Sequence, residues 1–308
     1  MRAMIVGAGL GSRLRPLTDL CPRPAVPVRG LPLVAYQLHL LARHGVREVM
    51  LNIHHLPELL IDAARRFAPP GMELHFSHET ELLDTGGGIR RVASFLRESD
   101  PCLLLGADML LDADLARLVG LHRERKDAWT MLLRDDPRAA RFGSIGIDAK
   151  GRVRRIGHRF ELPGAVREGL YVWANVVSAR AFERMPEREA FGHLDAWLTP
   201  WLAAGAQDVR GEIWDADHCS WEPVGTPGEY LAANLAPARL SYLDADALAR
   251  ARGVRFEEEC VIGAGASLGA GARLRRVVIW DGEHVPAGFC AHDGVFAGGV
   301  FHPCDGPA

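Results

Sequence analysis

Residues 4–18 read MIVGAGLGSRLRPLT, and this stretch decides how the rest of the sequence is interpreted. The apolar residues 4–6 are typical of a buried strand, and glycines at 7, 9 and 11 turn it into a loop. Glycine tolerates positive φ and lets backbone N–H groups approach an anion. A glycine-rich loop can also be a plain tight turn, but Arg13 and Arg15 add two guanidinium groups that suit phosphate oxygens. We therefore predict a phosphate-binding loop after the first strand of an α/β fold.

Length and composition fit a globular protein with one large domain and a small one. The chain has 308 residues, 48% of them hydrophobic, and a formal net charge of −3. Such a charge gives no basic field, so nucleic acid is not an expected partner. No apolar run reaches the roughly 18 residues of a membrane span, and the N-terminus has no signal-peptide layout. We expect a cytoplasmic protein with no membrane partner.

Cysteine and histidine patterns do not indicate a transition-metal centre. The 6 cysteines are scattered without paired spacing, and we expect reduced, structural thiols. The 13 histidines include neighbours such as His75 and His78, but no helical pair with an intervening glutamate.

Strand and helix patterns alternate through the first half of the chain. Strands are predicted at 46–53, 72–76 and 101–108, and helices at 32–44, 57–67, 89–96 and 113–124. Strands separated by helices imply right-handed crossovers and a parallel sheet covered on both faces. Ligands of such sheets bind beyond the carboxyl ends of the strands. We expect the first loop, the loop at 84–88 and Asp108 on that rim, although Asp108 could also cap the next helix.

Beyond residue 128 the predicted strands are shorter, at 129–133, 144–148, 153–158 and 170–174, and they predict an antiparallel extension of the sheet that walls one side of the pocket. Residues 217–227 are predicted as a loop and 228–234 as a helix. The glycines at 86–88 would let a flat base or sugar approach the backbone, or they form a helix entry turn.

The C-terminal tract repeats an apolar residue every sixth position, with small residues between. Ile262, Leu268 and Leu274 carry this spacing, and Trp280 and Pro286 continue it. The pattern indicates a short parallel β-helix rather than a flexible linker, because 277–280 is strongly apolar. We predict a catalytic domain at 1–236, a linking segment at 237–253 and the β-helix at 254–308. Its exposed end needs capping by residues 301–308 or by a second copy, which would make a homo-oligomer.

Five segments in order resemble the sugar-1-phosphate nucleotidyltransferases: GAGLGSRLRPLTD, PRPAVPVRGLPLVAYQL, LLGAD, WEPVGTPGEYLAAN and the hexapeptide tract. The stretch LLDTGGGI is similar to enzymes that uridylylate N-acetylmuramic acid 1-phosphate, and the added β-helix is similar to mannose-1-phosphate guanylyltransferases. The resemblance implies a Rossmann-like, mixed but mostly parallel sheet with helices on both faces, and a left-handed β-helix. It also implies that a sugar 1-phosphate attacks the α-phosphorus of a nucleoside triphosphate, with Mg²⁺ as cofactor and pyrophosphate as leaving group.

The resemblance assigns roles to individual residues. Catalytic roles fall on Arg13, Arg23 and Asp108, and metal binding on Asp108 and Glu222. Sugar-phosphate binding falls on Gly143, Asn175 and Glu222. Nucleotide binding falls on Ala8, Gly9, Gly11, Ser12, Arg13, Thr85, Gly86 and Gly87.

The sequence departs from the family pattern at the usual second metal ligand. Pro223 stands where the family has an aspartate, and Arg23 stands where it has a lysine. Either Glu222, Asp217 or Asp215 replaces the aspartate, or Asp108 and substrate phosphates hold the Mg²⁺ alone. An active transferase is the favoured interpretation, with uridine slightly ahead of guanosine and thymidine as the base. A catalytically impaired sugar-nucleotide-binding or regulatory subunit is the alternative, while an acyltransferase would need more hexapeptide coils.

Overall fold

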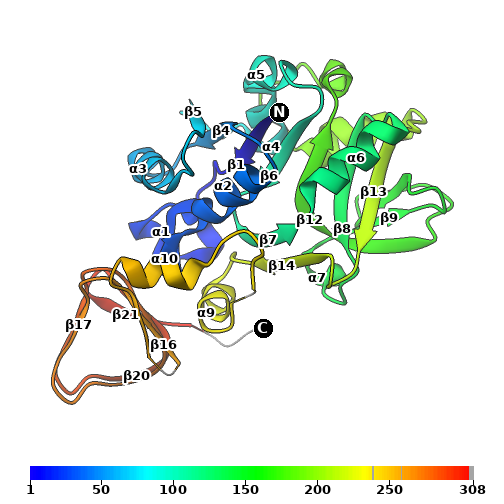
Figure 1. Cartoon of the computed structure of the whole chain (residues 1–308). Coiled ribbons are helices and arrows are strands. Elements are labelled where there is room, and N and C mark those ends of the chain that lie inside the picture. The colour runs from blue at the N-terminus through cyan, green and yellow to red at the C-terminus, as the bar shows by residue number, and fades with distance from the viewer. Residues whose placement is uncertain (238, 258, 305–308) are drawn as a thin grey trace.

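The structure is a computed structural model that describes residues 1–237, 239–257 and 259–304. A mixed sheet flanked by helices forms the larger part, and a narrower stack of strands forms the C-terminal part (Figure 1). Within the described ranges, no helix has the length and apolar character that crossing a membrane requires.

The predicted parallel core of the sheet is confirmed. Strand β1 (Arg2–Val6) lies between β4 (Glu48–Ile53) and β6 (Cys102–Gly106), and β5 (Glu73–His78) lies outside β4. All three pairings are parallel. Every residue of β6 is buried, as expected for a strand covered on both faces.

Helices cover both faces of this sheet, because successive residues of β1 enter different cores. Ala3 and Ile5 pack with Leu38 of α2, whereas Met4 packs with Ile89 of α4 and Leu96 of α5. The helices are α2 (Leu33–Arg43), α3 (Pro57–Phe67), α4 (Asp84–Arg91), α5 (Ala93–Arg97) and α6 (Leu115–Arg125). Helix α4 begins at Asp84, so the glycines at 86–88 lie inside a helix and not in the predicted loop.

A largely antiparallel extension completes the ten-stranded sheet, as predicted, although one of its pairings is parallel. Strand β12 (Arg167–Val177) runs antiparallel to β6 and joins the two halves. The added strands are β8 (Trp129–Arg134), β9 (Ser144–Ile147), β10 (Val153–Ile156), β11 (Phe160–Glu161) and β13 (Val209–Trp214). Short helical segments connect β12 to β13: Ala179–Arg184, His193–Leu198 and α8 (Thr199–Ala203).

A small second sheet was missed from the sequence. Strand β7 (Met109–Ala113) pairs antiparallel with β14 (Cys219–Pro223), so the predicted loop at 217–227 is partly a strand. The alternation of buried Cys219 and Trp221 with less buried neighbours was the available signal. Helix α9 (Pro227–Leu235) follows, and it begins with a capping box.

The C-terminal strands stack in parallel, with partners 17 residues apart. Val261 pairs with Val278, and Val278 pairs with Val295. The strands are β15 (Arg255–Glu257), β16 (Cys260–Ile262), β17 (Ser267–Leu268), β18 (Arg273–Ile279), β19 (His284–Val285), β20 (Cys290–Ala297) and β21 (Val300–Pro303). Helix α10 (Ala245–Ala251) precedes them.

A step of 17 residues is one residue shorter than three six-residue repeats, so the predicted spacing of six is not kept throughout. Ile279 and Val285 fill the interior of the stack in place of Trp280 and Pro286. Strands β15 and β21 pair antiparallel at its two edges. Strand β21 therefore provides part of the capping expected of 301–308; residues 305–308 lie outside the described residues.

The two parts of the molecule share one apolar core. Val261, Val278 and Val295 pack in the same cluster as Leu14 and Tyr230. The Tyr230 hydroxyl donates to the Pro27 carbonyl oxygen at 2.6 Å and accepts from Trp280 Nε1 at 3.0 Å. The stacked strands are thus packed against the first loops and α9.

Candidate functional site

The first loop is anchored by a buried pair that sequence reasoning missed. Asn52 is the next-to-last residue of β4, and its Oδ1 accepts hydrogen bonds from the N–H groups of Gly7 at 2.8 Å and Ala8 at 3.3 Å. Its Nδ2 donates to Glu79 Oε1 at 2.7 Å, and Glu79 Oε2 accepts from the Leu83 N–H. Both side chains are buried. Polar residues at the ends of two predicted strands were the only sequence signal.

The middle of the loop keeps backbone donors available. Among the described residues, none accepts a hydrogen bond from the N–H of Gly9, Leu10 or Gly11. Gly11 has φ of +62°, and its carbonyl oxygen accepts from Thr18 Oγ1 at 3.0 Å. Exposed Ser12 follows at the start of a short 3₁₀ turn. Adjacent unused N–H groups on a positive-φ turn are suited to an anion.

The two loop arginines have different surroundings. Arg13 lines a cavity of about 240 Å³, whereas Arg15 pairs with Asp19 at 3.0 Å on the surface. Arg23 pairs with Asp108 at 3.2 Å, and Asp108 lines the same cavity as Arg13. The structure therefore brings together all three residues that were predicted as catalytic.

The cavity lies beyond the carboxyl end of β6, where the sequence predicts ligand binding. Aromatic rings form much of its wall. The lining residues are Arg13, Asp108, Met109, Arg141, Phe142, Tyr171, Trp173, Trp221, Pro223, Gly225 and Glu229.

Trp173 enters the cavity through an irregularity in β12. The register of β12 against β8 shifts between Tyr171 and Asn175, and Trp173 has φ of +58°. A Cβ atom on Gly106 would lie 3.1 Å from Trp173 Cβ and 3.2 Å from Asp108 Oδ1. Strained backbone at such a position is common where a side chain must be presented to a ligand.

The carboxylates expected to compensate for Pro223 do not line the cavity of Asp108. Glu222 pairs with Arg138 at 2.9 Å and lines an adjoining hollow. Asp215 accepts from His218 at 2.6 Å on the surface, and this bond lowers the pKa of Asp215. Asp217 is exposed.

Glu229 is the second carboxylate of the cavity, alongside Asp108, among the described residues. Its Oε2 accepts from the N–H groups of Gly225 at 3.0 Å and Thr226 at 3.1 Å. Its Oε1 accepts from Arg141 at 3.2 Å. The capping box therefore fixes this side chain at the start of α9. Sequence reasoning missed Glu229, although the pattern Thr-x-x-Glu announced the cap.

The glycines at 86–88 pack against protein, which corrects the expectation of an open flat surface. The N–H groups of Gly86 and Gly87 donate to the Phe191 carbonyl oxygen at 2.8 and 3.1 Å. A Cβ atom on Gly86 would lie 2.3 Å from the Phe191 ring, and one on Gly87 2.3 Å from the Glu189 carbonyl oxygen. The hydroxyl of Thr85 bonds to His193 Nδ1 at 2.8 Å.

Two of the predicted sugar contacts have opposite environments. Asn175 is fully buried, and its Oδ1 accepts from Trp129 Nε1 at 3.0 Å and the Tyr171 hydroxyl at 2.9 Å. Direct contact with a sugar phosphate is incompatible with that burial, so Asn175 is corrected to a core residue. Gly143 is exposed, has φ of +105° and follows Phe142 of the cavity wall.

Buried His193 connects α4 to the cavity wall. Its Nε2 lies 3.2 Å from the Tyr171 hydroxyl, and its ring lies 4.4 Å from that of Trp173. Burial lowers the pKa of His193 to about 3, so the ring is neutral near pH 7.

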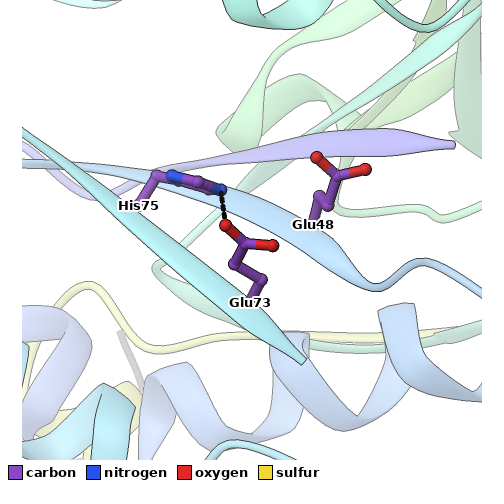
Figure 2. Close-up of side chains that lie close together, drawn as sticks. All are labelled: Glu48, Glu73 and His75. Atoms are coloured by element: carbon purple, nitrogen blue, oxygen red, sulfur yellow. Dashed lines mark ion pairs between the residues drawn. The ribbon is translucent and has the colours of Figure 1, made fainter. Parts of the chain in front are cut away.

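A separate group of metal-binding side chain types lies at the other end of the strands (Figure 2). Glu48 and Glu73 are paired first residues of β4 and β5, and His75 Nε2 lies 3.3 Å from Glu73 Oε1. Arg2 already compensates Glu48 at 2.8 Å. We assign this group no function.

Comparisons with known proteins bear on the family of this chain. The family model described as nucleotidyl transferase matches residues 2–239. The chain is 33% identical over 305 residues to a mannose-1-phosphate guanylyltransferase of Mycobacterium tuberculosis, covering 93% of this chain and 81% of that one. It is 30% identical over 182 residues to a UTP–glucose-1-phosphate uridylyltransferase of Synechocystis, covering 55% of this chain and 46% of that one.

Solved structures show the same fold. HddC from Yersinia pseudotuberculosis, complexed with GMP-PN, superimposes with a TM-score of 0.61 at 21% identity, covering 75% of this chain and 97% of that one. The family model spans most of the chain, and the match to the Mycobacterium protein covers 93% of the chain. The chain therefore belongs to the nucleotidyl transferase family.

Proposed function

We propose that this protein transfers a nucleotidyl group from a nucleoside triphosphate to a sugar 1-phosphate, giving a nucleotide-diphosphate sugar and pyrophosphate. The observation that carries the proposal is the convergence of Arg13, Asp108 and the Asp108–Arg23 pair beside a loop with unused N–H groups. The sugar-phosphate enzymes among the relatives support the same reaction.

Charge neutralisation and alignment are the tasks of this chain in the reaction. The N–H groups of Gly9 and Gly11 hold triphosphate oxygens, and Ala8 and Ser12 shape the loop around them. Arg13 and Arg23 stabilise negative charge that develops as pyrophosphate leaves. A phosphate nucleophile is already ionised near pH 7, so the site needs no general base.

The donor set around Asp108 fits Mg²⁺. Mg²⁺ takes hard oxygen ligands, and protein sites with one or two carboxylates are completed by phosphates and water. Asp108 offers a partly exposed carboxylate, whereas both oxygens of Glu229 are engaged. When bound, the ion would polarise phosphate oxygens and neutralise their charge. Arg23 contacts Oδ2 of Asp108, so a bound metal would compete with Arg23 for the charge of this carboxylate.

The sugar fits the aromatic side of the cavity. Phe142, Tyr171 and Trp173 present rings to it, and exposed Gly143 allows close approach. Glu222 lines the adjoining hollow, where a sugar contact stays a prediction. Thr85 stays a prediction for the base, whereas Gly86 and Gly87 are packed against Phe191 and Glu189 and their N–H groups are already bonded.

The C-terminal strands form a short left-handed β-helix in this proposal. The parallel pairing of β16, β18 and β20 at a constant step supports it. We retain the division into 1–236, 237–253 and 254–308. Assembly of two copies through this β-helix stays a prediction that size measurement in solution would decide.

Pyrophosphate release with Mg²⁺ tests the proposed activity. Because the Mycobacterium relative is a mannose-1-phosphate guanylyltransferase, mannose 1-phosphate with GTP is the first pair. Glucose 1-phosphate with UTP and dTTP follow, and Asp108→Asn is the negative control. Turnover of at least one pair by the unmodified protein is expected. Tight nucleotide binding without turnover of any sugar 1-phosphate would instead support the regulatory alternative.

A further inference from the structure

The second cavity arginine has no role in the reaction as described so far. Arg141 and Arg13 line the same cavity with Asp108, but they come from different elements. Arg13 follows β1, whereas Arg141 belongs to a short helix (Ala139–Phe142) after β8. Two cations thus line the cavity, and the triphosphate loop supplies only one of them.

Glu229 fixes the position of Arg141. Its Oε2 is held by two backbone N–H groups, so the Oε1 that bonds Arg141 cannot move freely. The Glu229 side chain is 13% exposed, while that of Arg141 is 45% exposed. Arg141 is therefore anchored by Glu229 and stays partly exposed. A guanidinium presents its N–H donors in a planar fork.

A sugar 1-phosphate brings a second highly charged phosphate next to the triphosphate. Their mutual repulsion must be offset for the attacking oxygen to approach the α-phosphorus. A planar cation suits a phosphate because it can donate two parallel hydrogen bonds. The Arg141 guanidinium lies 4.9 Å from the centroid of the Phe142 ring, and among the described residues nothing lies within 4 Å of a Cβ atom added to Gly143.

We propose that Arg141 binds the phosphate group of the sugar 1-phosphate, and that Glu229 is a positioning residue for Arg141. This inference rests on the proposed function, because it needs transfer to occur at the Asp108 cavity. It also gives Glu229 a task other than metal binding. In this proposal the triphosphate lies beside Arg13 and the acceptor phosphate beside Arg141.

Steady-state kinetics of Arg141→Gln would test the assignment. The assay uses whichever of mannose 1-phosphate with GTP or glucose 1-phosphate with UTP the unmodified protein turns over. We expect KM for the sugar 1-phosphate to rise between about tenfold and a hundredfold, as for loss of a charged hydrogen bond. KM for the nucleotide should change less than about threefold. Equal changes in both KM values, or no change in either, would overturn the proposal.

Two further variants separate this role from a structural one. Arg141→Lys keeps the charge without the fork, so its KM for the sugar 1-phosphate should lie between those of the unmodified protein and Arg141→Gln. Arg180→Gln is the matched control, because Arg180 pairs with Asp208 at the same 3.2 Å and is 47% exposed, away from the cavity. It should leave both KM values unchanged.

Glu229→Gln provides the test of the positioning role. Its amide can still accept from the N–H groups of Gly225 and Thr226, but it no longer holds Arg141 by charge. We expect Glu229→Gln to raise KM for the sugar 1-phosphate in the unmodified protein. In a protein that already carries Arg141→Gln, the same substitution should not raise it further. Additive effects of the two substitutions would contradict it. These comparisons require an active unmodified protein. If the unmodified protein turned over no substrate pair, the proposed function itself would be refuted.

Discussion

Arg23 Nη2 lies 3.2 Å from Asp108 Oδ2, so the two groups assigned to phosphate and metal neutralise each other in the free protein. Both side chains are partly exposed, which leaves the pair accessible to incoming charges. A triphosphate would attract Arg23 while a divalent cation attracts Asp108. Binding of the nucleotide together with its metal therefore exchanges one ion pair for two.

Breaking this pair should change metal binding before any nucleotide is present. In Arg23→Gln, Asp108 loses its partner, and titration calorimetry with Mn²⁺ should show tighter binding than in the unmodified protein. The same substitution should lower kcat/KM by about a hundredfold or more, since a preorganised charge is lost. Arg43→Gln, at the end of α2, is the control. Unchanged Mn²⁺ affinity would show that the pair does not restrain Asp108.

Arg13→Ala should lower kcat/KM by roughly a hundredfold or more, because one charge aimed at the transferring phosphates is removed. Arg15→Ala is a neighbouring control, since Arg15 pairs with Asp19 outside the cavity. Its effect should be at least tenfold smaller. A change of less than threefold for Arg13→Ala would remove Arg13 from the mechanism.

Gly86→Ala should destabilise the fold by about 1–3 kcal/mol, because its Cβ would lie 2.3 Å from the Phe191 ring. Gly120→Ala is the matched control within another helix. Gly120 is exposed in α6 and nothing lies within 4 Å of its added Cβ, so alanine there should stabilise by about 0.5–1 kcal/mol. Urea unfolding measures both. Equal stability of the two variants would show that the 189–191 segment yields to a methyl group.

The pH dependence of stability should report the buried His193. Its pKa is about 3 in the folded protein, mainly through burial, and near 6.5 when unfolded. Its neutral form therefore contributes full stability above about pH 6.5, and this is lost as the pH falls toward 3. Between these values the unmodified protein should lose up to about 1.4 kcal/mol per pH unit more than His193→Gln. Parallel curves in chemical unfolding at several pH values would contradict the assignment.

Deleting residues from 254 onward should lower stability more than it changes the chemistry. Val261, Val278 and Val295 would leave the cluster that contains Leu14 and Tyr230, and that apolar surface would be exposed. Thermal unfolding should shift downward and ANS binding should rise, while residual turnover per folded molecule persists. Loss of nucleotide binding in molecules that remain folded would show that the C-terminal strands help to build the site.

Asp108 and the first loop could be proposed from the sequence because each follows directly from local order, whereas the role of Arg23 came from the family resemblance. A strand that ends in a glycine loop or a carboxylate places that group on one rim of a parallel sheet. Asn52 and Glu79 could not be found in the same way. Their bond joins the ends of two strands, and only the register of β4 and β5 brings them together.

The other wrong predictions concern residues whose surroundings are set by a segment distant in the sequence. The glycines at 86–88 look like an open surface until Phe191 and Glu189 occupy it. In the C-terminal strands, Arg276 and Asp293 both take positive φ, at +56° and +50°, and bond to each other at 2.6 Å. Arginine rarely takes positive φ, so the coil length of 17 could not be read from the hexapeptide pattern.

Glu229 and Tyr230 are consecutive in α9, yet one supports a cavity arginine and the other is bonded to Trp280 of the stacked strands. Two neighbouring residues of α9 thus connect the cavity to the C-terminal strands. Anyone grafting a different repeat module onto this scaffold would need to rebuild the Trp280 partner of Tyr230. Without that hydrogen bond, the first turn of α9 would be less firmly packed next to Glu229, the residue that holds Arg141.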